Sequence, residues 1–162
     1  MAYTQGKYNP QNRNKYIGVR DPEYRSSWER SAFVKLDSNP NVLRWGSEIV
    51  VLPYVFELDG KKHKYYIDLY VEMRTGDTLV KWLIEIKPDD KLMPPKKPKI
   101  NSARALRGYN LRMADYYKNM DKWKFASRYA TMYSMDFLIM TEKGVYSVNG
   151  DTLTKISNKR HF

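Results

Sequence analysis

The sequence contains no cysteine and only two histidines among its 162 residues. These absences exclude disulfide bonds, zinc ribbons and a cysteine nucleophile, and they leave little for a histidine-based metal site. Any metal chemistry must therefore use carboxylates. No apolar run approaches the roughly 20 residues of a membrane span, and the N-terminus lacks the apolar stretch of a signal peptide. We expect a cytoplasmic protein that is not secreted by a signal peptide and has no membrane partner.

Positive charge is what the sequence has in excess. Lys and Arg number 29 against 18 Asp and Glu, so the formal net charge is +11. Hydrophobic residues make up 42% of the chain and aromatic residues 14%, which suffices for a packed core. A second core would need roughly 100 further residues. The composition indicates one folded basic domain whose large partner is a polyanion, with nucleic acid ahead of an anionic membrane.

The order of the predicted elements indicates an extended basic arm over residues 1–24, followed by a single domain over residues 25–162. The arm has no helical or strand periodicity, and Ser26 then caps a helix of about twelve residues that Asn39-Pro40 closes. Strands, a proline-rich connector, two helices and two more strands follow, at residues 49–56, 64–73, 79–87, 88–99, 101–120, 121–133, 136–140 and 145–148. This order predicts an α/β fold with a mixed sheet.

The second and third predicted strands form a hairpin that gathers charged residues on one face. With the turn centred on Gly76-Asp77, Asp68 faces Glu85, and Lys87 shares their side of the sheet. The opposite face of the hairpin is apolar. A separate turn at Asp59-Gly60 is predicted to place the first strand on the same apolar face.

The facing carboxylates Asp68 and Glu85 suggest a metal site. Their Cβ atoms would lie about 4.5 to 5.5 Å apart, and the charges would repel unless a cation lies between them. Mg²⁺ is the natural occupant, because it takes one or two carboxylates and shares phosphate oxygens. Lys87 would lie beside it, placed to orient or help deprotonate a water. The alternative is an ordinary solvent-exposed face on which Lys87 neutralises the pair.

Glu29 and Glu48 are further candidates near this site. Glu29 lies three residues after Ser26, so it can complete a capping box, yet it also shares a helical stripe with Phe33 and Leu36 that turns it toward the core. A carboxylate is seldom left there without a partner. Glu48 precedes the first predicted strand, and we expect it to support the ligands structurally rather than to bind the ion.

The sequence resembles the PD-(D/E)xK nuclease superfamily, with its restriction-endonuclease-like α-β-β-β-α-β core, through Glu29, Asp68 and Glu85-Ile86-Lys87. More closely, an ordered series of motifs is similar to the head completion nucleases of T-even-type tailed phages, and remotely to the endonuclease subunit of heteromeric transposases. The series includes Tyr24-Arg25-Ser26-Ser27-Trp28-Glu29, Arg44-Trp45-Gly46-Ser47-Glu48, Gly60-Lys61-Lys62, Ile84-Glu85-Ile86-Lys87-Pro88 and Asp121-Lys122-Trp123-Lys124. The usual Pro-Asp doublet of the superfamily reads Ile67-Asp68 here.

The resemblance implies a Mg²⁺-dependent DNA nuclease, with Mn²⁺ as a substitute ion, that acts in phage head completion and head-tail joining. Carried over by position, Asp68, Glu85 and the Ile86 backbone carbonyl would bind the metal. Lys87 would position the water, and Glu29 would complete the metal environment. Head or neck proteins of the phage would be partners, the host cytoplasm and the virion would be the location, and no small-molecule cofactor is expected.

Residues 85–128 hold twelve basic and five acidic residues, so most of the excess positive charge follows the predicted metal site. Lys and Arg neutralise phosphates without reading sequence, and no recognition pattern such as a helix-turn-helix is present. The expected DNA contacts are Lys91, Lys96, Lys97, Lys99, Arg104, Lys122 and Lys124. The alternative function is that of a non-catalytic basic DNA-binding structural protein of the virion neck.

Overall fold

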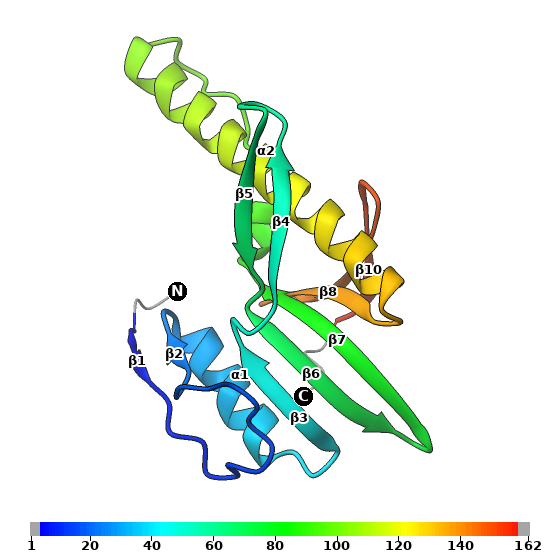
Figure 1. The fold of residues 1–162 in the computed structure, drawn as a ribbon. Helices are drawn as coiled ribbons and strands as arrows, with labels where there is room; N and C mark the ends of the chain where they lie inside the picture. The colour runs from blue at the N-terminus through cyan, green and yellow to red at the C-terminus, as the bar shows by residue number, and fades with distance from the viewer. Residues whose placement is uncertain (1–3, 159–162) are drawn as a thin grey trace.

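A computed structural model of the chain describes residues 4–158 (Figure 1). The outer ends of the predicted arm and domain, residues 1–3 and 159–162, lie outside the described residues. The elements are β1 (Gly6–Lys7), β2 (Glu23–Tyr24), α1 (Ser27–Ser38), β3 (Val42–Ser47), β4 (Val51–Phe56), β5 (Lys61–Tyr66), β6 (Leu69–Thr75), β7 (Thr78–Ile86), the 3₁₀ turn η1 (Asp89–Leu92), α2 (Ala103–Met132), β8 (Asp136–Thr141), β9 (Gly144–Asn149) and β10 (Thr152–Ser157).

The centre of the molecule is a six-stranded mixed sheet in the order β10-β9-β8-β7-β6-β3. β7 and β8 run parallel, while every other neighbouring pair in this sheet is antiparallel. A parallel pair needs a long crossover, and α2 provides it. Through α1, β3, β6, β7, α2 and β8, the chain follows the α-β-β-β-α-β order, so the predicted α/β fold class is confirmed.

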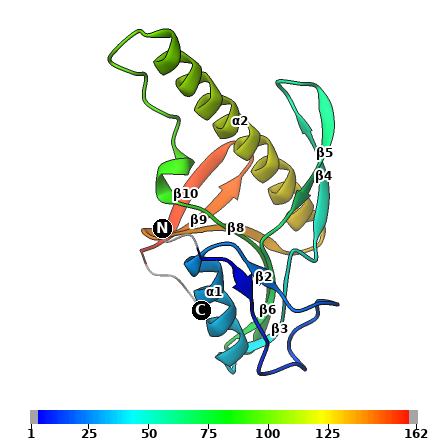
Figure 2. The same ribbon diagram turned by 90° about the vertical axis from the view of Figure 1, so that its left-hand side faces the viewer.

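Helices cover both faces of this sheet. On one face, Leu83 of β7 packs in a cluster with Trp123 of α2. On the other face, its neighbour Ile84 packs in a cluster with Phe33 of α1. Figure 2 shows α1 and α2 on opposite sides of the sheet. Because successive strand residues point to opposite faces, β7 is buried between two cores and its C-terminal end is held firmly.

The predicted first helix is present as α1. The Ser26 hydroxyl accepts a hydrogen bond from the Glu29 amide at 3.1 Å, which satisfies one of the unpaired donors at the helix start. The helix ends at Asn39, whose amide donates to the Lys35 carbonyl. Local capping chemistry is therefore sufficient to define both ends of this element.

The first strand of the central sheet is β3, which the sequence pattern did not indicate. Leu43 and Arg44 are exposed in succession and Trp45 and Gly46 are buried in succession, so the alternation that marks a strand is missing. The predicted first strand, residues 49–56, contains β4 instead. That strand pairs with β5 in a separate two-stranded ribbon and is not part of the central sheet.

The predicted second strand is divided at Ile67-Asp68, because β5 belongs to the ribbon and β6 to the central sheet. The register of β6 and β7 is as predicted, with Glu72 opposite Lys81. The predicted position of Asp68 within a continuous strand was wrong, since the residue lies in the bend that leads into β6.

The register predicted for the ribbon was wrong by two residues. A two-residue turn would pair Leu52 with Ile67, whereas Leu52 pairs with Tyr65. The turn contains four residues, 57–60, and ends with Gly60 in the left-handed region at φ +65°. Because the shift is an even number of residues, the alternation within the ribbon is as predicted. The predicted apolar face shared with Leu69 was wrong, because Leu52 packs in the cluster with α2, whereas Leu69 packs in the cluster with α1.

The two helices predicted after the connector form one helix, α2, of 30 residues. The predicted break at Asp121 does not occur, because its carboxylate is buried against the ribbon and accepts the Glu57 amide at 3.0 Å. The sequence pattern indicated Asp121 as a helix start, but its carboxylate is instead satisfied by an amide that is distant in sequence. Among the helices of residues 4–158, no segment is both long and apolar enough to cross a membrane.

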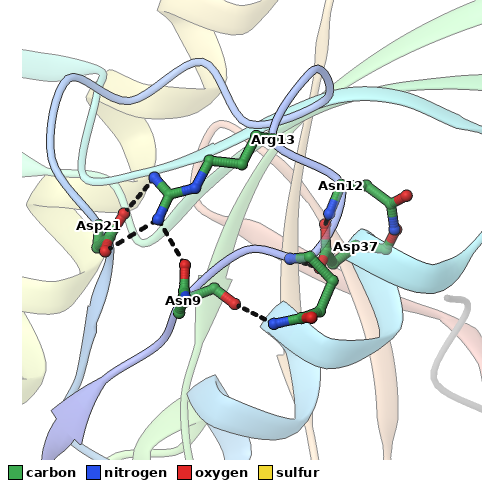
Figure 3. Close-up of polar contacts among 6 residues, drawn as sticks. Asn9, Asn12, Arg13, Asp21 and Asp37 are labelled. Atoms are coloured by element: carbon green, nitrogen blue, oxygen red, sulfur yellow. Dashed lines mark hydrogen bonds and ion pairs between the residues drawn. The ribbon is translucent and has the colours of Figure 1, made fainter.

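The N-terminal segment is extended and packs closely on the domain. β1 pairs with β2, and Tyr16 forms a parallel bridge with Trp45 of β3. The buried Asp37 of α1 accepts the amides of Gln11 and Asn12 at 2.7 and 3.1 Å (Figure 3). A second set of contacts joins Arg13 to Asp21 and Asn9 within the segment (Figure 3). The segment thus forms part of the layer that covers α1 and β3.

Candidate active site

Asp68 and Glu85 lie side by side where β6 begins and β7 ends. The last pair of the ladder joins Leu69 to Ile84, so its next step brings Asp68 next to Glu85. The Ile86 amide donates to Asp68 Oδ2 at 2.7 Å and thereby continues the contact between the two chains through a side chain. The carboxylate pair predicted from register is therefore present, and it lies where two strands emerge from the core.

Glu85 is the more deeply buried of the two carboxylates, with 2% of its surface exposed. Its Oε2 accepts a hydrogen bond from the Tyr65 hydroxyl at 2.6 Å, and its Oε1 lies 3.0 Å from the Lys87 ammonium. A buried carboxylate with these two partners is held in one orientation. Lys87 thus shares the face of Glu85, as the alternation of β7 predicts.

The electrostatics of the Asp68 and Glu85 pair favour a positive charge nearby. Burial, followed by the charge of Glu85, raises the pKa of Asp68 well above its ordinary value, against the opposing effects of Lys87 and the Ile86 amide. Burial lowers the pKa of Lys87, but Glu85 and Asp68 more than offset this, so its pKa is raised. The lysine is therefore held as an ammonium, and it lies in contact with one of the two carboxylates, Glu85.

A pocket of about 350 Å³ opens over Asp68, Glu85 and Lys87. The bend between β5 and β6 shapes it, because the Asp68 carbonyl accepts the Glu48 amide at 3.2 Å and pulls the two segments together. The other side chains around the opening are Arg25, Glu48, Lys64, Tyr65, Tyr66 and Lys122. The site is an open, polar cavity of a size that admits one phosphodiester group.

Glu48 borders the pocket at a strained backbone position. Its φ is 52°, in the left-handed region that non-glycine residues rarely adopt. Its side chain pairs with Arg25 at 2.9 Å, and both groups are well exposed. Glu48 therefore contributes a fixed turn and one ion pair at the rim, next to the carboxylates.

Glu29 lies in the first turn of α1, near the pocket, and its side chain caps the start of the helix. Its Oε2 accepts the amide of Arg25 at 2.7 Å, one residue before the Ser26 amide that the capping-box interpretation predicted. Glu29 and Asp68 border one small cavity, and the charge of Glu29 contributes to the raised pKa of Asp68. Within residues 4–158, however, no three His, Cys, Asp or Glu side chains are grouped closely enough to hold a metal ion together.

The predicted DNA contacts fall into two groups. Lys122 lies at the pocket, where its ammonium is 5.3 Å from the ring centre of Tyr65; burial lowers its pKa despite the attraction of Glu85. Lys124 points elsewhere and lies 3.5 Å from Asp151. The remaining residues are exposed on the connector and the start of α2, and they are Lys91, Lys96, Lys97, Lys99 and Arg104.

Sequence reasoning missed several residues around the pocket, above all Tyr65. The alternation of β5 places Tyr65 on the apolar face, which is correct because its ring is buried. No local signal shows that its hydroxyl reaches Glu85, because that contact depends on the ribbon leaving the sheet beside the site. Lys64 and Tyr66 border the pocket for the same reason.

The fold and the site together define a class of protein. A mixed sheet in α-β-β-β-α-β order, with an aspartate and a Glu-x-Lys sequence at the adjoining ends of two strands, is the arrangement of restriction-endonuclease-like nucleases. The chain belongs to the family described as TnsA-like endonuclease N terminal, whose sequence pattern matches residues 39–142. That range includes Asp68, Glu85 and Lys87 but not Glu29.

A second comparison extends the match to nearly the whole chain. The sequence is 38% identical to a protein named head completion nuclease, from Enterobacteria phage T4, over 148 residues, which are 90% of this chain and 95% of that protein. The resemblance inferred from the ordered series of motifs is thus confirmed.

Proposed function

We propose that this chain is a metal-dependent deoxyribonuclease that hydrolyses phosphodiester bonds with little sequence specificity. The observation that carries the proposal is the buried Glu85 beside Asp68 in an open pocket, where the Lys87 ammonium lies 3.0 Å from Glu85 Oε1. Membership of an endonuclease family supports it. A solvent-exposed face of unrelated charges would not bury a carboxylate, because burying an ionised group without a functional or structural partner is costly.

The donors present at the site fit a hard divalent cation. Two adjacent carboxylates supply oxygen ligands, and burial followed by the neighbouring charge of Glu85 raises the pKa of Asp68. We propose Mg²⁺, with Mn²⁺ as a substitute, held by Asp68, Glu85 and the Ile86 carbonyl, with Glu29 completing the environment from behind. When bound, the ion would act as a Lewis acid toward phosphate oxygens and would acidify a water.

The protein groups would position the substrate and the water. The ion pair with Glu85 keeps Lys87 protonated, so we assign it the orientation of the attacking water and the stabilisation of negative charge that develops on the phosphate. Glu85, fixed by Tyr65, keeps its carboxylate in one rotamer during this process. Lys122 approaches the same pocket from α2 and would contact a neighbouring phosphate.

DNA would extend from the pocket over the exposed basic residues of the connector and α2. The proposed phosphate contacts are Lys91, Lys96, Lys97, Lys99, Arg104, Lys122 and Lys124. Side chains that contact only phosphates carry no sequence information, which supports the proposed low specificity. Lys124 would have to exchange Asp151 for a phosphate, so we expect the smallest contribution from it.

We further propose that the protein acts in phage head completion and head-tail joining. The relative with 38% identity over 95% of its own length bears the name head completion nuclease, which supports this role. Head or neck proteins would then be its partners, and it would work in the infected host cytoplasm and in the virion.

The test is nicking of a supercoiled plasmid in Mg²⁺ by wild type and by Glu85→Gln. We expect the variant to lose more than about 100-fold in rate, a larger loss than that typical of residues that only support metal ligands, and to keep its DNA affinity. Chelation of the divalent ion should abolish wild-type nicking. Glu72→Gln is the matched control, because Glu72 lies on the same strand pair and accepts the Tyr70 hydroxyl at 2.6 Å.

Two outcomes would count against the proposal. Equal nicking by wild type and Glu85→Gln would show that the site is elsewhere. A wild-type protein that binds DNA but cleaves none in either Mg²⁺ or Mn²⁺ would favour a structural DNA-binding protein of the virion neck.

A further inference from the structure

The β4–β5 ribbon has one face that the fold does not use. Its inner face belongs to the core, with Leu52, Tyr54, Phe56 and Tyr65 in one cluster with α2. Side chains on paired strands alternate between faces, so the other residues point away from α2. We call this the outer face of the ribbon, and its members are Val51, Pro53, Val55, Lys62, Lys64 and Tyr66.

The ribbon is fixed to the helix beneath it along most of its length. The Asp121 carboxylate accepts the Glu57 amide at 3.0 Å near the tip, and the Lys118 ammonium lies 5.3 Å from the ring centre of Phe56. Figures 1 and 2 show the ribbon projecting from the sheet beside α2, at an angle to the helix. The outer face is therefore a rigid platform rather than a mobile flap.

The composition of the outer face suits a polyanion. Its six residues, all of which the structure describes, include two lysines and no carboxylate. Val51 is 42% exposed and Tyr66 51% exposed; these two residues pair at the end of the ribbon beyond Lys64, so apolar and aromatic surface adjoins the charges. Lys62 and Lys64 are two residues apart on one strand, with Cα atoms about 6.6 Å apart; at that spacing they can contact different phosphates.

This face leads directly into the candidate active site. Lys64 and Tyr66 border the same pocket as Asp68 and Glu85, and Asp68 follows Tyr66 by only two residues. An unbroken path of positive charge and exposed aromatic surface therefore runs from the ribbon to the carboxylates. A peptide partner would not require such continuity with the pocket, whereas a polymer of phosphates would.

We propose that DNA leaving the pocket runs along the outer face of the ribbon, with Lys62 and Lys64 contacting successive phosphates and the Tyr66 ring stacking on a base at the mouth. The inference rests on the proposed nuclease function and adds a substrate-guiding surface to it. The surface lies on β5, apart from the connector and helix that hold the other proposed phosphate contacts. The ribbon is inserted in the chain between β3 and β6, the strand that begins at the site.

Equilibrium DNA binding without divalent ions tests the path independently of cleavage. Fluorescence anisotropy between 50 and 300 mM salt gives the slope of the logarithm of the binding constant against the logarithm of the salt concentration. For Lys62→Ala/Lys64→Ala this slope should be smaller in magnitude by about 2, with roughly tenfold weaker binding at low salt. The control Lys35→Ala/Arg74→Ala removes the same charge at the end of α1 and at the far end of β6. It should change the slope by less than about 0.5.

Tyr66 gives a separate readout, because stacking is not an ionic interaction. Tyr66→Ala should weaken binding fivefold or more, about 1 kcal/mol, without a change in salt slope, and Tyr66→Phe should retain wild-type affinity. An unchanged slope for the ribbon double variant, or equal losses for both double variants, would overturn the proposal. Failure of plasmid nicking by wild type would instead count against the nuclease function, so the two failures are distinguishable.

Cross-linking provides a second measurement that does not depend on affinity. Because the chain contains no cysteine, Lys62→Cys and Lys64→Cys each create a unique attachment point for a photoactivatable maleimide. Both should cross-link to DNA, whereas Lys35→Cys should not. Absence of cross-links at both ribbon positions, with DNA bound, would also overturn the proposal.

Discussion

At the scale of single residues, the site depends on how one buried carboxylate is held. Glu85 has a hydroxyl on one oxygen and an ammonium on the other, from Tyr65 and Lys87. The Tyr65 hydroxyl is in turn fixed because its ring is buried beneath Lys122. Removing a group that orients a metal ligand typically lowers metal affinity or activity by about 10-fold to 100-fold, and Glu85 is one of the proposed ligands.

Tyr65→Phe tests this positioning role. The ring keeps its packing while the 2.6 Å hydrogen bond to Glu85 is lost, so we expect the Mg²⁺ concentration for half-maximal cleavage to rise about 10-fold to 100-fold. Tyr70→Phe is the matched control, because it also removes a 2.6 Å bond to a carboxylate, that of Glu72. A metal titration of plasmid nicking measures both, and an equal effect of the two variants would contradict the assignment.

At the scale of elements, the chain that follows Lys87 is bound to the hairpin of β8 and β9. Asp89 Oδ1 accepts the Tyr146 hydroxyl at 2.6 Å, and Oδ2 lies 3.2 Å from the Lys143 ammonium. The Asp89 amide donates to Glu142 at 3.0 Å. The connector therefore leaves the end of β7 in a fixed direction, which keeps Lys87 on the face of Glu85.

Tyr146→Phe should weaken this fastening in a pH-dependent way. The hydrogen bond from Tyr146 is the main cause of the lowered pKa of Asp89, whose ordinary value is 3.8. A lowered carboxyl pKa stabilises the fold above that value and ceases to do so as the pH falls through the folded-state pKa. We expect a loss of about 1 to 2 kcal/mol at pH 7, which shrinks below pH 3.8.

Urea unfolding at several pH values measures the difference between wild type and Tyr146→Phe. Tyr117→Phe, on an exposed position of α2, controls for the loss of a hydroxyl and should change stability by less than about 0.5 kcal/mol. A difference that stays constant between pH 7 and pH 3 would show that Asp89 is not the group responsible.

At the scale of the whole molecule, the N-terminal segment closes one side of the structure. Asp37, with 1% of its surface exposed, accepts the Tyr8 hydroxyl at 2.9 Å in addition to two amides of the segment. Burial and this hydrogen bond raise the pKa of Tyr8 to about 12. Tyr8 and Tyr16 pack on the cluster around Trp45, so the segment covers a core that would otherwise meet solvent.

Asp37→Ala should release this segment. Three donors lose their acceptor, two of them backbone amides, so we expect the free energy of unfolding to fall by about 2 to 4 kcal/mol. Limited trypsin digestion should then cut faster after Arg13 and Lys15. Asp115→Ala, on an exposed position of α2, should alter neither, and unchanged proteolysis of Asp37→Ala would mean that other contacts hold the segment.

Local chemistry in the sequence was enough to define α1 and the hairpin of β6 and β7. Ser26 caps the helix whatever surrounds it, and Gly76, at φ +59°, sets the turn that brings Asp68 to Glu85. Alternation then places Lys87 on their face. These features depend on residues that are near in sequence or linked by one tight turn, so they follow from composition and spacing alone.

Only the tertiary structure decided which of the predicted elements meet. Period-2 patterns specify which side chains of a strand share a face, but neither the partner strand nor the helix that covers that face. The ribbon of β4 and β5 was therefore not separable from the central sheet by sequence. Asp121 continues α2 because a distant amide satisfies it, and Tyr65 reaches Glu85 because the chain bends at Ile67-Asp68. Contacts between residues far apart in sequence carry no local signature, and they are what complete the pocket.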